Sequence, residues 1–271
     1  MGVVNVTPDS FSDGGRYLDA RTAIEHGVEL AGQGAAILDV GGESTRPGAD
    51  PVPVEEELRR VVPVVEGLAG TARVSVDTSK TAVAAAALDA GADYVNDVTA
   101  FRSEPGLAEL VADRGVDCCL MHMLGTPRTM QDDPRYDDVV AEVKAFLEER
   151  LAFAVGQGIA EERVMLDPGI GFGKTVEHNL ALIGRLDELV AIGRPLVFGV
   201  SRKSFLGKLT GREVGERAVA TAAANVLALE RGASIFRVHD VAETRDALSV
   251  AAATLAGRWP ATSPRTTTTT T

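Results

Sequence analysis

Three observations predict that this sequence folds as an α/β protein, a (β/α)₈ barrel of the TIM type. Eight short runs rich in apolar and β-branched residues occur along the chain, and most of them do not alternate with polar residues. Such runs are typical of parallel strands that are buried on both faces. Helical stretches lie between the runs, and many of them end in glycine. Parallel strands joined by crossover helices close naturally into a barrel, and a doubly wound open sheet is the alternative.

The eight predicted strands follow one another along the chain with a helical stretch between neighbours. They are short, and their apolar residues are consecutive, as in a sheet that is covered on both sides. The runs are GVVNV (2–6), AAILDV (35–40), RVSVD (73–77), DYVNDV (93–98), DCCLMH (117–122), RVMLD (163–167), PLVFGVS (195–201) and SIFRVH (234–239).

Helices are predicted where apolar residues recur three and four positions apart, because this spacing gives a helix one apolar face. Four such stretches are residues 23–30, 58–68, 139–155 and 219–229. A glycine just after a helix supplies the left-handed cap that the following turn needs. Glycines occupy that place before the next strand at Gly34, Gly70, Gly91, Gly115, Gly158, Gly193 and Gly232.

The length and composition fit one folded domain. Of the 271 residues, 45% are hydrophobic and 24% are charged. Barrels of this kind commonly run to about 250 residues as one domain. We therefore expect a catalytic domain at residues 1–258 and a disordered, threonine-rich tail at residues 259–271.

The charge and the absence of long apolar runs argue against several classes of partner. A formal net charge of -12 disfavours general nucleic-acid binding, because both molecules would be negative. No apolar run approaches about 18 residues and no signal peptide is apparent, so we expect no membrane partner and a cytoplasmic location. Cys118 and Cys119 are adjacent and lack the spacing of a zinc site, and burial in a strand explains them better.

Polar residues concentrate at the carboxyl ends of the predicted strands, where barrels of this type carry their chemistry. One polar strand end could be a helix cap, but capping alone does not explain polar residues at all eight ends. In strand order these residues are Asn5, Asp39, Asp77, Asn96 with Asp97, His122, Asp167, Ser201 followed by Arg202 and Lys203, and Arg237 with His239.

Two of these carboxylates also have a structural interpretation. Asp77 precedes Thr78 and could support a turn before the next helix. Asp167 precedes Pro168, and an Asp-Pro pair often begins a turn. The sequence leaves both interpretations open.

The paired polar residues have similar alternatives. Asn96 and Asp97 could divide the work, with one facing inward and the other capping the next segment. Arg237 and His239 lie two positions apart on a strand and so face the same side, where they could form part of a structural ion pair.

Common cofactor motifs are missing from the sequence. The segment GIGFGKT (169–175) looks like a phosphate-binding loop, but that motif needs glycine at position 168, where this chain has proline. No GxGxxG motif opens a helix after a strand, so a nicotinamide site has no support. The motifs HExxH and GxSxG do not occur either.

Eight segments are specific enough to identify a family. They are NVTPDSFSDGG (5–15), DVGGESTRPGA (39–49), SVDTSK (75–80), YVNDV (94–98), MHMLGTPRTMQ (121–131), LDPGIGFGK (166–174), FGVSRKSFLG (198–207) and RVHDV (237–241). In this order they closely resemble the dihydropteroate synthases, a family of pterin-binding enzymes. The resemblance covers nearly the whole chain, and it includes the family's two signature segments.

The resemblance implies a transferase of folate biosynthesis on a (β/α)₈ barrel. The reaction that it implies joins 6-hydroxymethyl-7,8-dihydropterin diphosphate to 4-aminobenzoate, giving 7,8-dihydropteroate and diphosphate with Mg²⁺ as cofactor. Members of the family are generally homodimers. The segment STRPGA lacks the insertion that resembles sulfonamide-resistant relatives, so the resemblance also implies a sulfonamide target.

The family's residue roles carry over to matching positions of this chain. The resemblance implies that the pterin is bound by Asp77, Asn96, Asp167 and Lys203. It implies that the diphosphate and Mg²⁺ are bound by Asn5, Arg237 and His239, with Asn5 as the metal ligand. The implied walls of the aminobenzoate pocket are Thr45, Arg46, Pro47, Phe172 and Ser201. Phe11 lies on the first mobile loop, and the implied catalytic residues are Asp13 of that loop, Asp77, Lys203 and Arg237.

These residue types suit the implied chemistry. A carboxylate such as Asp167 can accept two hydrogen bonds from the amidine-like N–H edge of a pterin. The guanidinium of Arg237 offers a fork that matches phosphate oxygens, and Mg²⁺ with the Asn5 oxygen would neutralise charge on the leaving group. The aromatic amine is neutral at pH 7, so we expect catalysis to rest on positioning and electrostatics.

Two other functions remain open at this point. Methyltetrahydrofolate–corrinoid methyltransferases share the pterin-binding barrel, but the segments TPDSFSDGG and STRPGA, with Arg237 and His239, favour a diphosphate substrate. A non-catalytic paralogue that binds pterin without turnover is the second alternative. Turnover of pterin diphosphate with 4-aminobenzoate separates all three.

Overall fold

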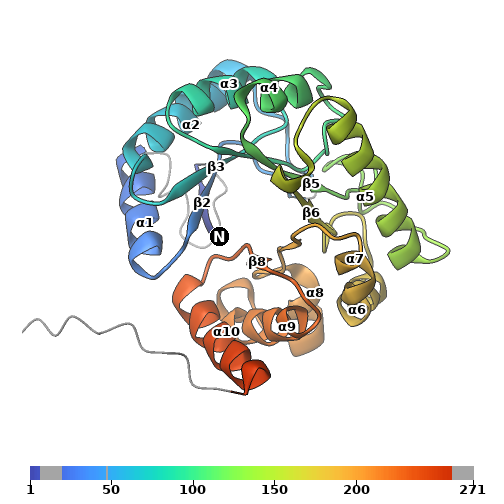
Figure 1. Cartoon of the computed structure of the whole chain (residues 1–271). Coiled ribbons are helices and arrows are strands. Elements are labelled where there is room, and N and C mark those ends of the chain that lie inside the picture. Colours follow the sequence, from blue (N-terminus) through green and yellow to red (C-terminus); the bar gives the residue numbers. More distant parts are fainter. Residues whose placement is uncertain (7–19, 47, 258–271) are drawn as a thin grey trace, which may run out of the picture.

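The computed structural model describes residues 1–6, 20–46 and 48–257. Strands form the centre, and helices surround them in a ring (Figure 1). The strands are β1 (Gly2–Asn5), β2 (Ile37–Gly41), β3 (Arg73–Asp77), β4 (Tyr94–Asp97), β5 (Asp117–Met121), β6 (Val164–Asp167), β7 (Val197–Phe198) and β8 (Ile235–Phe236).

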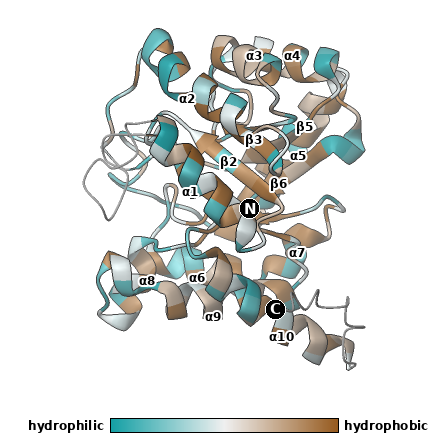
Figure 2. Cartoon of the chain, turned by 90° about the vertical axis from the view of Figure 1, so that its left-hand side faces the viewer, coloured by the Kyte–Doolittle hydropathy of each residue, from teal (hydrophilic) through white to brown (hydrophobic). Residues whose placement is uncertain are grey.

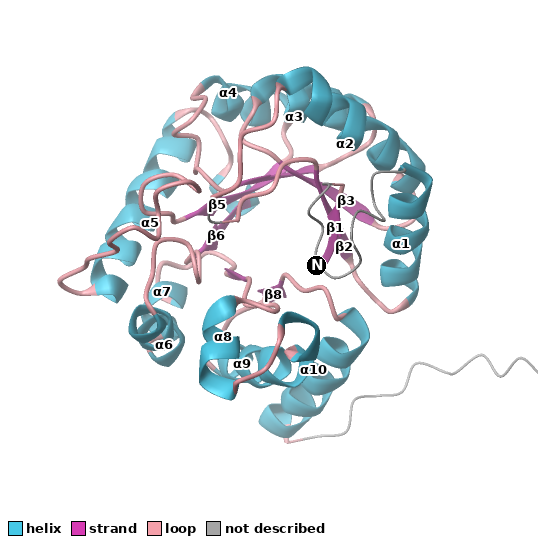
Figure 3. Ribbon diagram, turned by 180° about the vertical axis from the view of Figure 1, so that it is seen from behind, coloured by secondary structure: helices cyan, strands magenta, loops and turns pink. Residues whose placement is uncertain are grey.

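The strands close into the predicted barrel. Strands β1 to β6 pair in sequence order as one parallel sheet, and β7 pairs in parallel with β8. Two single parallel bridges complete the circle: Leu166 with Leu196 joins β6 to β7, and Gly2 with Val238 joins β8 to β1. The ring is visible from the opposite side in Figure 3. The open-sheet alternative is therefore wrong.

The four predicted helices are confirmed as α1, α2, α5 and α9. Shorter helices lie between them and α10 follows α9, and together these complete the outer ring. The helices are α1 (Ala20–Gly32), α2 (Val54–Leu68), α3 (Thr81–Asp89), α4 (Gly106–Arg114), α5 (Val139–Gly156), α6 (Val176–Gly184), α7 (Leu186–Val190), α8 (Ser204–Thr210), α9 (Ala218–Glu230) and α10 (Val241–Ala256), with 3-10 turns at Glu161–Arg163 and Val214–Glu216.

The glycines that were predicted to follow helices adopt the left-handed conformation. All seven have φ angles between 59° and 113°, from Gly115 to Gly91. A residue with a Cβ atom is strained in this conformation, which explains why glycine stands there.

The apolar residues of the strands fill two spaces. One face packs against the helices and forms the main core (Figure 2). The other face points into the barrel, where a smaller buried cluster consists of Tyr94, Cys119, Met165 and Val197. Tyr94, Met165 and Val197 lie in the amino-terminal half of their strands and Cys119 lies at the middle of β5, so the interior above them is left to the polar residues at the carboxyl ends.

Strands β7 and β8 are much shorter than the predicted runs 195–201 and 234–239. Pro195 has no N–H to donate to a neighbouring strand. After Phe198 the chain turns, with the Lys203 N–H donating to the Val200 carbonyl at 3.1 Å. After β8 the His239 N–H donates to the Ser201 side chain at 3.1 Å in place of a strand carbonyl. The Ser201 side chain thus takes the place of a ladder partner in this part of the barrel.

Two expectations concern the outside of the barrel. Within the described ranges, no helix has the length and apolar character that a membrane crossing requires. The predicted tail at residues 259–271 lies outside the described residues, as do Phe11, Asp13 and Pro47.

Candidate active site

A buried ion-pair network crosses the barrel at the carboxyl ends of β2, β3 and β8. The Arg237 Nε atom donates to Asp39 at 2.6 Å, and its terminal nitrogen donates to Asp77 at 2.8 Å. Asp39 is fully buried and Asp77 nearly so. The predicted structural ion pair at Arg237 therefore exists, although its partners are carboxylates of other strands. It also holds two of the predicted site residues, Arg237 and Asp77, together.

Asp39 is a site residue that the family resemblance did not single out. Its carboxylate accepts hydrogen bonds from the Ser75 hydroxyl at 2.6 Å and the Asn96 amide at 3.2 Å, besides that of Arg237. It orients two predicted ligand-binding side chains at once. Its position at the carboxyl end of a strand was the available signal, since the other site residues share that position.

The structure decides between the interpretations offered for Asn96 and Asp97. Asn96 faces inward to Asp39. Asp97 instead caps the following turn, because its carboxylate accepts from the backbone N–H groups of Thr99 at 2.8 Å and Phe101 at 2.7 Å. The predicted alternative in which one residue faces inward and the other caps the next segment is therefore correct.

The turn after β3 depends on Thr78, so Asp77 is not needed for it. The Thr78 hydroxyl accepts the Lys80 N–H at 3.2 Å, whereas the Asp77 carboxylate is bonded to Arg237. Burial raises the pKa of Asp77, while the positive charge of Arg237 opposes the rise. Asp77 thus remains available to a ligand in the barrel mouth.

Asp167 both begins a turn and faces the site. One carboxylate oxygen accepts the Gly169 N–H at 2.6 Å. The other lies near Gly199, where an added Cβ atom would be 3.8 Å away. Burial raises the pKa of Asp167, and nearby Lys203 counteracts that rise. One oxygen of Asp167 therefore supports the turn, as the structural interpretation predicted, and the other oxygen faces the end of β7.

Lys203 reaches back from the segment after β7 to the loop after β6. Its ammonium donates to the Ile170 carbonyl and lies 4.4 Å from the centre of the Phe172 ring. Burial lowers the pKa of Lys203 to about 8, although Asp167 raises it. The structure thus brings Lys203 and Phe172 together, which are a predicted pterin residue and a predicted aminobenzoate residue.

Four successive carbonyl groups of the loop after β6 are each held by a side-chain donor. Besides Lys203 at Ile170, Gln131 donates to Gly171 at 2.7 Å and Tyr136 donates to Gly173 at 2.8 Å. Lys174 of the same loop donates to Phe172 at 3.0 Å. Donors from two other segments of the chain, the loop after β5 and the segment after β7, therefore help to fix the backbone that carries the Phe172 ring.

Lys174 and His122 form a buried pair beneath this loop. The Lys174 ammonium lies 2.9 Å from His122 Nδ1. Burial lowers the pKa of Lys174 well below its ordinary value, and burial together with Lys174 lowers the pKa of His122 to about 2. Sequence reasoning placed His122 at a strand end but missed its partner, because nothing in the local pattern predicts a buried lysine.

Ser201 and His239 meet at the ends of β7 and β8. The Ser201 oxygen lies 2.9 Å from His239 Nδ1 while it accepts the His239 backbone N–H. The hydroxyl proton is then free to bond to Nδ1, an assignment that leaves the ring proton on Nε2. Burial and the charges of Arg237, Arg202 and Arg46 together lower the pKa of His239 to about 3, although Asp240 raises it. An anion at this place would meet a strongly positive surrounding.

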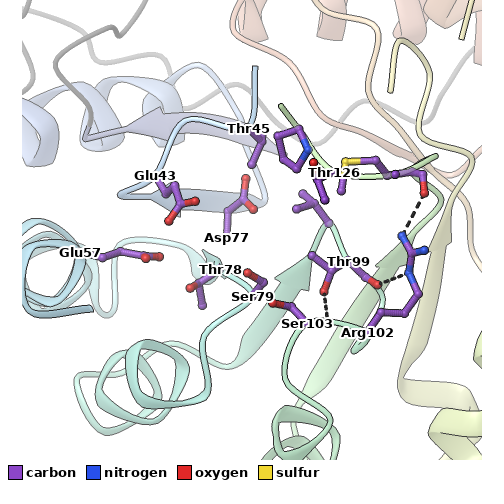
Figure 4. A pocket seen from close by; sticks show the side chains of 14 residues that line it. Glu43, Thr45, Glu57, Asp77, Thr78, Ser79, Thr99, Arg102, Ser103 and Thr126 are labelled. Atoms are coloured by element: carbon purple, nitrogen blue, oxygen red, sulfur yellow. Dashed lines mark hydrogen bonds between the residues drawn. The ribbon is translucent and has the colours of Figure 1, made fainter. Parts of the chain in front are cut away.

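A cavity of about 350 Å³ opens beside Asp77 between the loops that follow β2, β3, β4 and β5. Figure 4 shows the carboxylates of Glu43, Glu57 and Asp77 on one side of it, with Thr45 at its rim. Its apolar wall includes Val98 and Met123. Thr45 thus lines the same cavity as Asp77, one of the predicted pterin residues.

Asn5 ends β1 at the mouth of the barrel and is partly buried. Across the described part of the chain, no three His, Cys, Asp or Glu side chains are grouped as a metal site. Mg²⁺ commonly uses one or two protein oxygens and completes its shell with substrate phosphates and water. The donors present therefore fit a metal that is bound together with a diphosphate.

Comparison with known proteins agrees with this geometry. Residues 1–239 match the family described as "Pterin binding enzyme". The dihydropteroate synthase of Escherichia coli (strain K12) is 49% identical over 260 residues, which cover 95% of this chain and 92% of the relative.

Solved structures give the same result. The Yersinia pestis dihydropteroate synthase in complex with a sulfonamide drug has a TM-score of 0.91 at 45% identity, covering 94% of this chain and 93% of that one. The Xanthomonas albilineans dihydropteroate synthase with 4-aminobenzoic acid has a TM-score of 0.88 at 52% identity, covering 94% and 92%. The chain therefore belongs to the pterin-binding enzyme family and, within it, to the dihydropteroate synthases.

Proposed function

We propose that this chain joins 6-hydroxymethyl-7,8-dihydropterin diphosphate to 4-aminobenzoate, which makes it a transferase of folate biosynthesis. The observation that carries this proposal is the buried polar floor at the carboxyl ends of the strands. There Arg237 bonds to Asp77 and to Asp39, which also accepts from Asn96, and the charge of Lys203 acts on the Asp167 carboxylate. The floor offers carboxylates for N–H donors and cations for oxygen acceptors, as a pterin diphosphate requires.

The pterin ring binds against Asp167, Asp77 and Asn96. The Asp167 oxygen turned toward Gly199 accepts from the amidine-like edge, because its other oxygen already accepts from Gly169. Lys203 donates to a ring oxygen or nitrogen from the opposite side. Gly199 carries no side chain, and an added Cβ atom there would lie 3.8 Å from Asp167 and 3.9 Å from Arg237, so the backbone leaves room for a flat ring.

The diphosphate lies near Arg237 and His239. The contact of Ser201 with Nδ1 leaves the ring proton of the neutral His239 imidazole on Nε2. Mg²⁺ would be held by the Asn5 side-chain oxygen together with diphosphate oxygens, and it would neutralise charge on the leaving group.

The aminobenzoate pocket is formed by two loops. Phe172 presents its ring from the loop after β6, and Thr45, Arg46 and Pro47 come from the loop after β2. Ser201 closes the pocket at the end of β7. Sulfonamides copy the aniline of the substrate, and the segment STRPGA carries no inserted residue to exclude their larger tails, so they should compete for this pocket.

Catalysis is a displacement at the pterin methylene carbon. The bond from this carbon to the diphosphate oxygen breaks, and the electron pair leaves with the oxygen. The aniline nitrogen forms the new bond and then loses a proton to water. Arg237 stabilises charge on the departing diphosphate, while the carboxylate of Asp77 stabilises positive charge that develops on the pterin methylene. Lys203 orients the ring, and Asp13 of the first loop adds a second carboxylate.

The domain and the assembly belong to this proposal as well. Residues 1–258 form the catalytic domain, and the tail at 259–271 takes no part in it. Two copies pair through the outer surface of α9 and α10, where Val219, Leu227, Val250 and Leu255 are exposed. Measuring the mass of the protein in solution tests the pairing of the two copies.

The protein works in the reducing cytoplasm, which agrees with two buried, unbridged cysteines.

Turnover with defined substrates tests the function. The protein with Mg²⁺ should convert pterin diphosphate and 4-aminobenzoate to dihydropteroate, and a sulfonamide should inhibit competitively against aminobenzoate. The variant Arg237→Lys keeps a charge beside Asp39 and Asp77 but loses the guanidinium fork, so it should reduce turnover strongly while binding of pterin alone changes little. Equal losses for pterin and pterin diphosphate would contradict the role of Arg237, and absent turnover would contradict the function itself.

A further inference from the structure

The segment 43–52, which carries Thr45 and Arg46, is closed at its base by a single carboxylate. One oxygen of Glu43 accepts the Val52 N–H at 3.3 Å, and the same oxygen contacts the Lys80 ammonium. The first and last residues of the segment are thereby tied to one another and to the start of α3.

Lys80 joins this carboxylate to a second, more deeply buried one. Its ammonium contacts both Glu43 and Glu57, and the side chain of Glu57 is only 1% exposed. Burial lowers the pKa of Lys80, but its hydrogen bonds to the two glutamates outweigh burial, and the net shift is upward. Lys80 is therefore charged at neutral pH, and we call Glu43, Lys80 and Glu57 the loop-base cluster.

The loop-base cluster lies next to the site. Its two glutamates line the cavity, whereas Lys80 does not. Glu43, Glu57, Asp77 and Thr45 line the cavity shown in Figure 4. Lys80 is not one of the described residues that line it. Lys80 can therefore influence the reaction only through its neighbours, and of these Glu43 begins the loop that carries Thr45 and Arg46.

The residue before the loop is held independently of Lys80. The Gly42 carbonyl accepts from Arg60 of α2 at 2.9 Å. A Cβ atom at Gly42 would come within 2.7 Å of Val61, so the backbone lies directly on the helix. Loss of Lys80 should therefore release the loop from Glu43 onward while β2 and α2 remain packed.

We propose that Lys80 is a positioning residue for the aminobenzoate subsite. By holding Glu43 against Glu57 it sets the base of the 43–52 loop, and so the direction in which Thr45 and Arg46 face the second substrate. The inference rests on the proposed function and extends it to a residue outside the substrate space. Pterin diphosphate, which binds on the floor, depends little on this cluster.

Steady-state kinetics with each substrate varied in turn test the proposal. In Lys80→Met the KM for aminobenzoate and the inhibition constant of a sulfonamide should rise about tenfold, because small misplacements of a binding group have large effects. The KM for pterin diphosphate should change less than about twofold. Lys80→Arg, which retains the charge, should recover most of the loss. Lys144→Met, which removes a surface pair with Glu148 on α5, serves as the matched control.

A second variant covers the case in which Lys80→Met fails to fold because it leaves Glu57 unpaired. Glu43→Gln keeps the contact of Lys80 with Glu57 and weakens only its link to the loop, so it should raise the aminobenzoate KM in the same selective way. Equal rises in both KM values, or a fall in kcat with both KM values unchanged, would overturn the proposal. If the unmodified protein shows no turnover, the proposed function fails before Lys80 is tested.

Discussion

The loops after β6 and β2 both border the site, yet they are held in different ways. In the β6 loop, four successive carbonyls from Ile170 to Gly173 are bonded to side chains from several segments. In the β2 loop, the loop-base cluster ties the two ends together. Its described middle has backbone bonds from Gly48 to Pro127 and from Ala49 to Arg46. The first loop is built into the barrel, whereas the second is attached to it at the base.

This difference fits the two substrates. The β6 loop supports Lys203 and Asp167, which belong to the pterin floor, so its backbone must be in place before the ligand arrives. The β2 loop presents residues to the second substrate, which must pass in and out. A loop fastened mainly at its ends can adjust to that substrate without disturbing the floor.

The largest test of this comparison uses one glycine from each loop. At Gly169, with φ of 65°, a Cβ atom would lie 1.8 Å from the His122 carbonyl oxygen. Gly169→Ala should therefore lower the free energy of unfolding by about 3–5 kcal/mol, through both strain and overlap. Gly48 has a similar φ of 81° but open space around it. Gly48→Ala should cost only about 1 kcal/mol. Denaturant unfolding measures both, and equal costs would contradict the comparison.

A second test separates the substrates that the two loops serve. Asp167→Asn should weaken pterin binding by about 1.5–3 kcal/mol, because it removes a charged acceptor from the floor. Thr45→Ala should leave pterin affinity unchanged and affect only aminobenzoate. Calorimetric titration with a pterin ligand gives the first value. Unchanged affinity in Asp167→Asn would mean that this carboxylate serves only the turn to Gly169.

A third test uses pH to follow Lys203, which links the β6 loop to the substrate. Burial lowers its pKa to about 8, so the ammonium is present below that pH and is lost above it. The value of kcat/KM for pterin diphosphate should therefore decline above pH 8, approaching about tenfold per pH unit. Lys203→Arg keeps its charge, so any remaining activity should stay level over the same range. A decline that persists in Lys203→Arg would assign the titration to another group.

The smallest expected effects come from single donors of the β6 loop. Tyr136→Phe removes the hydroxyl that donates to Gly173 and should lower the free energy of unfolding by about 1 kcal/mol. Gln131→Ala removes an exposed donor to Gly171 and should cost about 0.5 kcal/mol. Thermal unfolding at neutral pH checks both. A larger cost for Gln131→Ala than for Tyr136→Phe would show that burial does not set the strength of these bonds.

The sequence by itself determined the barrel, its helices and the strand ends at which the site lies. Runs of buried residues, the spacing of apolar faces and glycine after helices report local burial and local backbone conformation, and these are properties of short segments. The motif segments likewise identified the family and residues such as Asp167 and Lys203. Strands β7 and β8 were predicted too long, because the bond of His239 to Ser201 replaces a ladder bond there.

Only the tertiary structure decided which polar groups pair with one another. Asp39 and Arg237 are separated by 198 positions in the chain, and closure of the barrel brings them within 2.6 Å. The same closure sets Lys174 against His122 and the Lys203 ammonium against the Ile170 carbonyl. No local pattern encodes these partners. Each buried polar group must find a partner among the side chains that folding brings near it, because leaving it unpaired in the interior is costly.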